Sequence, residues 1–97
     1  MTRYTKVAAR THIKSRHPGC PEFVVEHLAE KISEKEWRRA TLGMAVGITM
    51  QNLLRHEMTD YDQLRLMGID RKVARNRVQK KIHAMLSHWG KKPIKDP

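Results

Sequence analysis

The segment from Ala40 to Leu54 is the one long run without a charged residue in a chain of which 31% is charged. Such a segment gains most from being covered by the rest of the chain, so we expect it to form the central element of the core. It contains Gly43 and Gly47, and a glycine inside a helix costs about 1 kcal/mol relative to alanine. We therefore expect a neighbouring helix to cross this segment at close range at the two glycines.

Apolar residues recur at helical spacing on both sides of this segment, and no stretch alternates in the manner of a strand. The predicted helices cover residues 2–16, 21–32, 34–57, 60–67 and 71–89. The sequence therefore predicts an all-α fold. We expect a compact bundle of four longer helices and one short helix around the central apolar helix at about 34–57.

Polar residues and glycines mark where these helices start and stop. A capping pattern, in which a side chain accepts hydrogen bonds from free backbone amides, occurs at Ser33 with Glu36 and at Thr59 with Asp62. Gly68 is placed to close the short helix, and Asp70 to cap the last one. The residues expected to face the core are Tyr4, Val7, Ala8 and Thr11 in the first helix, Phe23, Val24, His27, Leu28 and Ile32 in the second, and Ala74, Val78, Ile82, Met85, Leu86 and Trp89 in the last.

A length of 97 residues suits one small domain, which we place at residues 1–90. Residues 1–16 form either its first helix or a basic arm that orders on binding, and residues 91–97 are expected to be a flexible basic tail. The single cysteine, Cys20, cannot form an internal disulfide, and the N-terminus lacks the apolar stretch of a signal peptide. The apolar run is shorter than the ~20 residues of a membrane-spanning helix, so we expect a cytoplasmic protein without a membrane partner.

Lys and Arg outnumber Asp and Glu by 20 to 10, and the excess lies at the two ends of the chain. Residues 1–16 carry five basic residues and no acid, and residues 70–97 carry nine against two. This balance favours a polyanionic partner, above all DNA or RNA, whose phosphates bind Lys and Arg regardless of sequence. The residues predicted to contact phosphates are Lys6, Arg10, Lys14, Arg38, Arg39, Lys72, Arg77, Lys80 and Lys81.

We therefore expect a small, non-enzymatic nucleic-acid-binding protein that needs no cofactor. The alternative is a protein-interaction module or inhibitor that docks on an acidic partner surface. If the short helix and the last helix formed a helix-turn-helix, the residues reading a groove would be Lys72, Asn76, Gln79 and Lys80.

The two tryptophans are open to different interpretations. Trp37 stands beside Arg38 and Arg39 and could stack on bases, whereas Trp89 lies on an apolar helix face and is expected in the core.

A dense polar cluster, RHEMTDYD, follows the apolar run directly. The candidate polar site comprises Arg55, His56, Tyr61, Asp62, Arg71 and Arg75. One interpretation is a divalent-metal or nuclease-like site with ligands from His56, Glu57, Asp60 and Asp62, although we predict no metal here because capping already accounts for Thr59 and Asp62. A second is a binding site in which Arg55, His56 and Tyr61 hold a phosphate and stack a base.

The third interpretation of the cluster is a structural lock, in which His56 and Tyr61 hydrogen-bond across the turn. Arg71 and Arg75 flank the apolar face of the last helix, where a cation needs an acidic partner. We therefore predict an ion pair between Asp62 and Arg71 or Arg75.

The spacing of these polar residues also resembles a known pattern. The sequence LLRHEMTDYDQLRLMGIDRKVARNRV, with Trp89 after it, resembles the bacterial and fungal family called domain of unknown function 2293, over residues 50–89. That family's core reads roughly R-H-x-x-T-x-Y-D, then G-x-D-R-x-x-A-R, then a late tryptophan. The matching positions are Arg55, His56, Thr59, Tyr61, Asp62, Gly68, Asp70, Arg71, Ala74, Arg75 and Trp89. The resemblance supports the fold and implies no activity, cofactor or substrate.

Overall fold

Helices make up most of the structure, a computed structural model that describes residues 2–90. They are α1 (Lys6–Arg16), α2 (Glu22–Glu34), α3 (Leu42–Glu57), α4 (Tyr61–Leu66) and α5 (Arg71–Trp89). The all-α prediction is confirmed. The predicted tail, residues 91–97, lies outside the described residues. No helix within residues 2–90 has both the length and the apolar character to cross a membrane.

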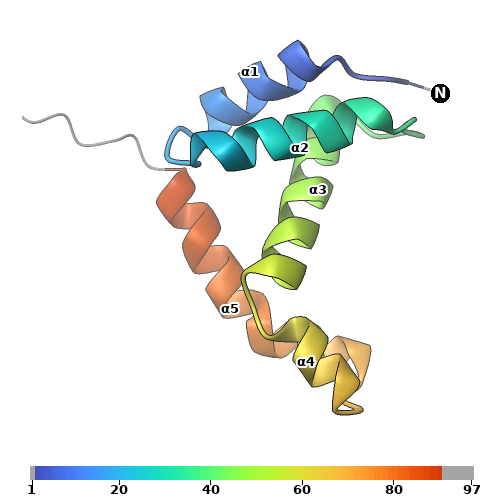
Figure 1. Cartoon of the computed structure of the whole chain (residues 1–97), viewed down its shortest axis with the longest axis vertical. Coiled ribbons are helices and arrows are strands. Elements are labelled where there is room, and N and C mark those ends of the chain that lie inside the picture. The colour runs from blue at the N-terminus through green and yellow to red at the C-terminus, as the bar shows by residue number, and fades with distance from the viewer. Residues whose placement is uncertain (1, 91–97) are drawn as a thin grey trace, which may run out of the picture.

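The helices form a flat molecule of 45 × 42 × 20 Å, whose thickness is about two helix diameters. The helices α1 and α2 lie side by side at one end, and α3 runs away from them towards α4 (Figure 1). The last helix, α5, returns from α4 until its end reaches the turn between α1 and α2 (Figure 1). There the backbone N–H of Gly19 donates to the carbonyl of Trp89 at 2.8 Å, which joins the end of α5 to the turn between α1 and α2.

The core is one continuous cluster to which every helix contributes. The residues that are 0–3% exposed are Ala9, Ile13, Val25, Leu28, Ala29, Ile32, Ala45, Val46, Met50, Leu54, Ala74, Val78 and Ile82. The apolar segment does supply the central helix, yet α3 is not covered on all sides. Met44 and Ile48 on its outer face remain 52% and 48% exposed.

The start of α3 differs from the prediction of a helix from about residue 34. Thr41 is the N-cap, and its side-chain oxygen accepts from the backbone N–H of Met44 at 3.2 Å. Ser33 lies inside α2, where its hydroxyl donates to the carbonyl of Glu30. The predicted cap at Ser33 and Glu36 is therefore wrong.

Burial of Trp37 explains why the helix does not begin earlier. Its side chain is only 6% exposed, and its indole N–H donates to the carbonyl of Ile32 at 3.1 Å. The backbones of Trp37 and Thr2 also exchange two hydrogen bonds, of 2.8 and 3.0 Å. These contacts need an extended chain around residue 37, and they outweigh the local helical preference. A buried Trp37 has no face available for stacking on bases.

The predicted inner faces of α1 and α2 are partly wrong. In α1 the buried residues are Ala9 and Ile13, and Val7 is 66% exposed. In α2 the predicted Val24, Leu28 and Ile32 are buried, but His27 is exposed and Phe23 is 77% exposed. The small side chain of Ala9 lets α1 lie close to α2, and the helix turns its larger Val7 outwards as a result.

Neither Gly43 nor Gly47 of α3 marks the close helix crossing that was predicted there. A Cβ at Gly43 would meet the His12 ring at an ordinary 3.6 Å, and a Cβ at Gly47 would meet nothing within 4 Å. The tight approach is instead at Gly19, where a Cβ would lie 3.2 Å from backbone atoms of His88 and Trp89.

The second half of the chain follows the prediction closely, except that the cap predicted at Thr59 and Asp62 is wrong: Asp60 is the N-cap of α4, without a side-chain cap hydrogen bond, and Asp62 pairs with His56. Gly68 ends the α4 turn with a φ of 88°, a conformation that favours glycine. Asp70 caps α5 by accepting from the backbone N–H of Lys72 at 3.0 Å. The helix α5 spans residues 71–89 as predicted, with Ala74, Val78, Ile82 and Trp89 buried.

Candidate nucleic-acid interface

The helix α5 carries six cations: Arg71, Lys72, Arg75, Arg77, Lys80 and Lys81. All six are exposed. None of them belongs to an ion pair among the described residues, where the pairs lie within α1 and α2, between Arg3 and Glu36, and between His56 and Asp62. Their charge is therefore available to a partner.

Helix geometry places five of these six cations on two flanks of α5, while Arg71 falls beside the apolar face. With about 100° between successive residues, one face collects Lys72, Arg75, Asn76, Gln79, Lys80 and His83. We call this set the α5 basic face. Gln79 and His83 are joined on it by a side-chain hydrogen bond of 2.9 Å. Three of the four residues predicted to read a groove are polar and exposed, and the fourth, Gln79, is partly buried.

The other flank of α5 carries Arg77 and Lys81, and acidic side chains lie near Lys81. Lys81 lines a shallow hollow of about 550 Å³ together with Glu57, Asp60 and Asp62. These carboxylates offset part of the Lys81 charge, so the two flanks of α5 differ in their attraction for an anion.

The predicted phosphate contacts in α1 already have acidic partners. The Nζ atoms of Lys6 and Lys14 lie 3.6 and 3.1 Å from carboxylate oxygens of Glu26 and Glu22. Arg10 engages both oxygens of Glu26, with Nε at 2.7 Å from one and Nη2 donating to the other at 3.0 Å. The hydrogen bond from Arg10 is the main reason that the pKa of Glu26 is lowered. The α1 cations therefore bind α1 to α2.

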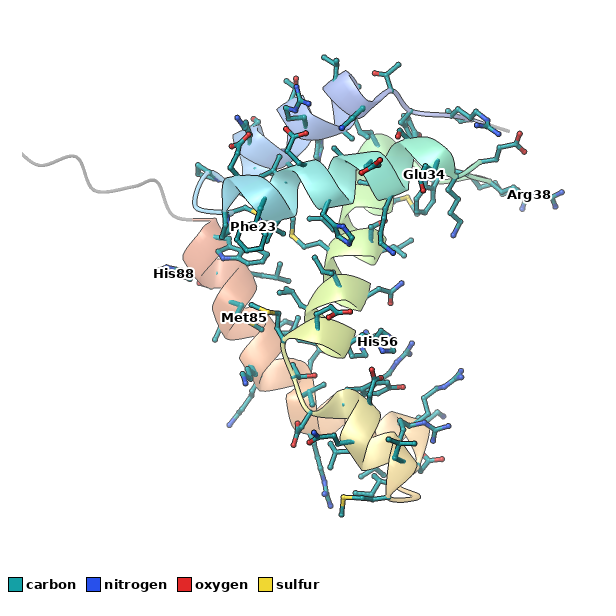
Figure 2. The ribbon with its side chains drawn as sticks, in the orientation of Figure 1. Phe23, Glu34, Arg38, His56, Met85 and His88 are labelled. Atoms are coloured by element: carbon teal, nitrogen blue, oxygen red, sulfur yellow. The ribbon has the colours of Figure 1, made fainter. Side chains whose placement is uncertain are left out.

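The two basic ends of the chain do not merge into one surface. Within residues 2–90, α1 packs on α2 and α3, whereas α5 packs on α3 and α4. Figure 1 shows α2 between α1 and most of α5. The predicted contacts Arg38 and Arg39 lie in the segment between α2 and α3, and Figure 2 shows Arg38 projecting from that end of the molecule.

The RHEMTDYD cluster forms the joint between α3 and α4. The Thr59 hydroxyl donates to the carbonyl of Arg55 and accepts from the backbone N–H of Tyr61 at 3.2 Å. His56 meets the Tyr61 ring edge-on at 5.3 Å between ring centroids, and its Nδ1 lies 2.6 Å from an oxygen of Asp62. Local hydrogen bonds thus explain why these residue types stand at these positions.

The predicted ion pair from Asp62 to Arg71 or Arg75 is wrong, because Asp62 pairs with His56. Both arginines are exposed, so water solvates their charge and neither needs a carboxylate. The predicted hydrogen bond between His56 and Tyr61 is replaced by the edge-on ring contact.

Arg55, in the last turn of α3, is the one buried charged residue among residues 2–90, with 8% of its surface exposed. Its guanidinium lies 5.7 Å from the centroid of the Tyr61 ring, and Nη1 donates to the side-chain oxygen of Asn52 at 3.2 Å. The Nε atom is buried and has no hydrogen-bond partner. Burial and the positive charge of Arg75 lower the pKa of Arg55.

Two apolar surfaces were not predicted from the sequence. Leu66, Met67 and Val73 are 88%, 75% and 44% exposed at the corner between α4 and α5. In the sequence, this surface was indicated only by the apolar pair Leu66 and Met67 before Gly68. A groove of about 540 Å³ also lies between α2, α3 and the end of α5, lined by Phe23, Val24, His27, Leu53, Leu54, Glu57, Met58 and Trp89. Figure 2 shows Phe23 and Met85 directed into the space that these helices enclose, with His56 beyond α3 and His88 outside α5.

The described residues contain no group of three or more His, Cys, Asp or Glu side chains that could hold a metal ion. His56 and Asp62 form a pair, and Glu57 and Asp60 lie at the hollow beside them.

Comparison with known proteins gives one match. A family model described as an uncharacterised conserved protein (DUF2293) matches residues 12–90. The resemblance predicted at residues 50–89 is thereby confirmed, and it extends back through α3 and α2 into α1. No curated protein and no solved structure matches the chain.

Proposed function

The chain belongs to the DUF2293 family of uncharacterised conserved proteins, and for this member we propose a non-enzymatic role in binding DNA or RNA. The α5 basic face makes the principal contacts with phosphates. The α1 cations contribute less, because Glu22 and Glu26 already offset their charge. The protein acts in the cytoplasm and needs no cofactor.

The observation that supports this proposal is the row of cations on α5 that form no ion pair within residues 2–90. Lys72, Arg75 and Lys80 fall at helical spacing on one exposed face, with polar Asn76 between them. A helix of this kind binds phosphates by charge and releases the counterions that surround them. The turn Met67–Asp70, which contains Gly68 and joins α4 to α5, is also of the length found in helix-turn-helix proteins.

Two double variants test where the phosphates bind. Lys72→Gln with Lys80→Gln is expected to weaken binding to a short DNA or RNA duplex by about tenfold or more at moderate salt. The matched control, Lys6→Gln with Lys14→Gln, removes the same charge from α1 and is expected to cost less than about threefold. Fluorescence anisotropy with a labelled duplex measures both. Equal losses in the two variants would contradict the proposed interface.

The second candidate function is docking on an acidic protein, and one observation favours it. Leu66, Met67 and Val73 form an exposed apolar corner directly beside Lys72. Apolar anchors ringed by charge are typical of protein interfaces.

A double variant with Leu66→Ser and Met67→Ser distinguishes nucleic-acid binding from docking on a protein. Phosphate contacts do not use these side chains, so nucleic-acid affinity is expected to stay within about twofold of wild type. Affinity purification with nuclease treatment is the companion measurement. A partner protein that survives nuclease and is lost in the Leu66→Ser, Met67→Ser variant would favour the second function.

A further inference from the structure

We propose that the α5 basic face lies in the major groove of duplex DNA, where Asn76 contacts the edge of an adenine. The inference rests on the proposed function, since it specifies which nucleic acid this face binds and which residue distinguishes one base from another. Phosphate contacts position a protein on DNA but carry no sequence information, so a sequence preference needs a side chain that reaches the base edges.

The α5 basic face is basic at its two edges and carries amides between them. Arg75 and Lys80 are five residues apart, which separates them by about 140° around the helix axis. Asn76 and Gln79 lie between these two cations on the same face. A helix in the major groove has a phosphate backbone on each side and base edges in front of it, so this arrangement matches both kinds of contact.

The outer side of α5 is open to a partner of this size. The helices that pack on α5 within residues 2–90 are α3 and α4, and Figure 1 shows α5 along one edge of the flat molecule. The α5 basic face extends from Lys72 to His83, which is about 17 Å along the helix axis. The major groove of B-DNA, about 12 Å wide, admits a helix of this kind.

The turn before α5 fixes this helix relative to α4. The backbone N–H groups of Gly68 and Ile69 donate to the carbonyls of Arg65 and Leu64 at 3.0 and 3.1 Å. The Nη1 atom of Arg65 also donates to the carbonyl of Ile69 at 3.1 Å, and Asp70 then caps α5. A helix held in this way has little freedom to lose on binding, which favours base contacts of defined geometry.

Asn76 is the residue of the face best suited to contact a base. Its side chain is exposed, and no side-chain hydrogen bond within residues 2–90 involves it. Gln79, by contrast, is partly buried, and its amide nitrogen donates to Nε2 of His83 at 2.9 Å. The amide of asparagine offers a donor and an acceptor side by side. Adenine presents the matching acceptor N7 and donor N6 in the major groove.

Other nucleic acids match the α5 basic face less well than duplex DNA does. Duplex RNA has a deep and narrow major groove whose bases a side chain cannot reach. Proteins that bind single strands stack the bases on aromatic side chains. No Phe, Tyr or Trp belongs to the α5 basic face, and Trp89, at the end of α5, is only 7% exposed.

The first experiment compares three labelled probes of one mixed sequence, namely a short duplex DNA, the equivalent duplex RNA and the single-stranded DNA. Fluorescence anisotropy at one salt concentration measures the three affinities. The protein is expected to bind the duplex DNA at least about fivefold more tightly than either of the other probes. Equal or tighter binding of the duplex RNA or of the single strand would overturn the inference and leave the proposed function standing.

The second experiment tests the contact from Asn76. Selection from a randomised duplex DNA library is expected to give a preferred site that contains an adenine. Asn76→Ala is expected to bind the selected duplex about tenfold more weakly than wild type, with unchanged affinity for an unselected duplex, because the phosphate contacts remain. Gln63→Ala is the matched control and keeps both affinities, since this exposed amide lies on α4 at the hollow beside Lys81.

A modified base shows whether the contact is in the major groove. Replacing the selected adenine by 7-deazaadenine removes the N7 acceptor and leaves the minor-groove edge unchanged. Wild type is expected to lose about fivefold in affinity for this duplex, whereas Asn76→Ala is expected to lose nothing. No loss in wild type, or an equal loss in wild type and Asn76→Ala, would contradict the contact.

The outcomes separate the inference from the proposed function. Failure to bind any of the three probes would contradict the proposed function and the inference together. Binding that Lys72→Gln with Lys80→Gln weakens, but without any base preference that depends on Asn76, would overturn the inference alone. A preference that requires both Asn76 and the adenine N7 supports the inference.

Discussion

Cys20 lies in the turn between α1 and α2, and its thiol is buried beside Glu22. Burial, with a smaller effect of Glu22, raises the pKa of the thiol from 9.0 to about 11. Since the thiolate is the reactive form, the native protein is expected to react with iodoacetamide about 100-fold more slowly than the unfolded chain near neutral pH. Mass spectrometry with and without denaturant gives the two rates. Similar rates in the native protein and the unfolded chain would show that the thiol is accessible and that its pKa is not raised.

His17, the C-cap of α1, gives the stability of the protein a dependence on pH. Burial, and then the positive charges of His12 and Arg16, lower the pKa of His17 below its ordinary 6.5. At a pH between the lowered pKa of the folded state and 6.5, the unfolded state binds the proton more readily than the folded state does. The contribution of His17 to the free energy of unfolding is therefore complete above pH 6.5. It is lost as the pH falls through the lowered pKa of the folded state.

A His17→Gln variant isolates this contribution. Wild type is expected to lose more free energy of unfolding than His17→Gln when the pH falls from about 7.5 to about 5, because only wild type must protonate the half-buried imidazole of His17. Urea unfolding at each pH measures the loss. The exposed His88→Gln is expected to follow wild type, and a pH-independent gap between wild type and His17→Gln would contradict the assignment.

At the scale of helices, the sequence predicted best the helices whose bounds are set by residues within them or next to them. The helix α5 has a capping aspartate, a regular apolar face and a glycine after it, all within its own stretch of chain. The start of α3 depends on Trp37 pairing with Thr2, far away in the sequence, and no local pattern reveals that contact. The same limit applies to the inner face of α1, which its packing on α2 decides.

Two glycine substitutions test where helices approach closely. Gly19→Ala would place a Cβ 3.2 Å from the backbone of His88 and Trp89, which cannot move aside as a side chain can, so a loss of about 1–3 kcal/mol in stability is expected. Gly47→Ala meets nothing within 4 Å inside α3, so a gain of about 0.5–1 kcal/mol is expected. Chemical denaturation of both variants gives the comparison. Destabilisation by Gly47→Ala would contradict this account and would indicate that a neighbouring helix crosses α3 closely at Gly47.

For the whole molecule, fold class and charge excess were predictable, and the distribution of that charge was not. The sequence places +5 in residues 1–16, yet three of those cations meet glutamates of α2 that only the fold brings to them. Arg55 was a candidate from its position after the apolar run. Its lack of an ion pair with any carboxylate of residues 2–90 depends on how the helices pack around it, which no spacing in the sequence specifies.

The salt dependence of nucleic-acid binding tests the central claim most directly. Roughly three phosphate contacts, from Lys72, Arg75 and Lys80, predict a slope of about −3 in a plot of log K against log salt concentration for duplex DNA. The expected result is a linear decrease with such a slope for wild type and a slope smaller by about two units for Lys72→Gln with Lys80→Gln. Absence of binding at low salt, or affinity that stays constant up to about 0.5 M salt, would contradict the claim that α5 binds phosphates.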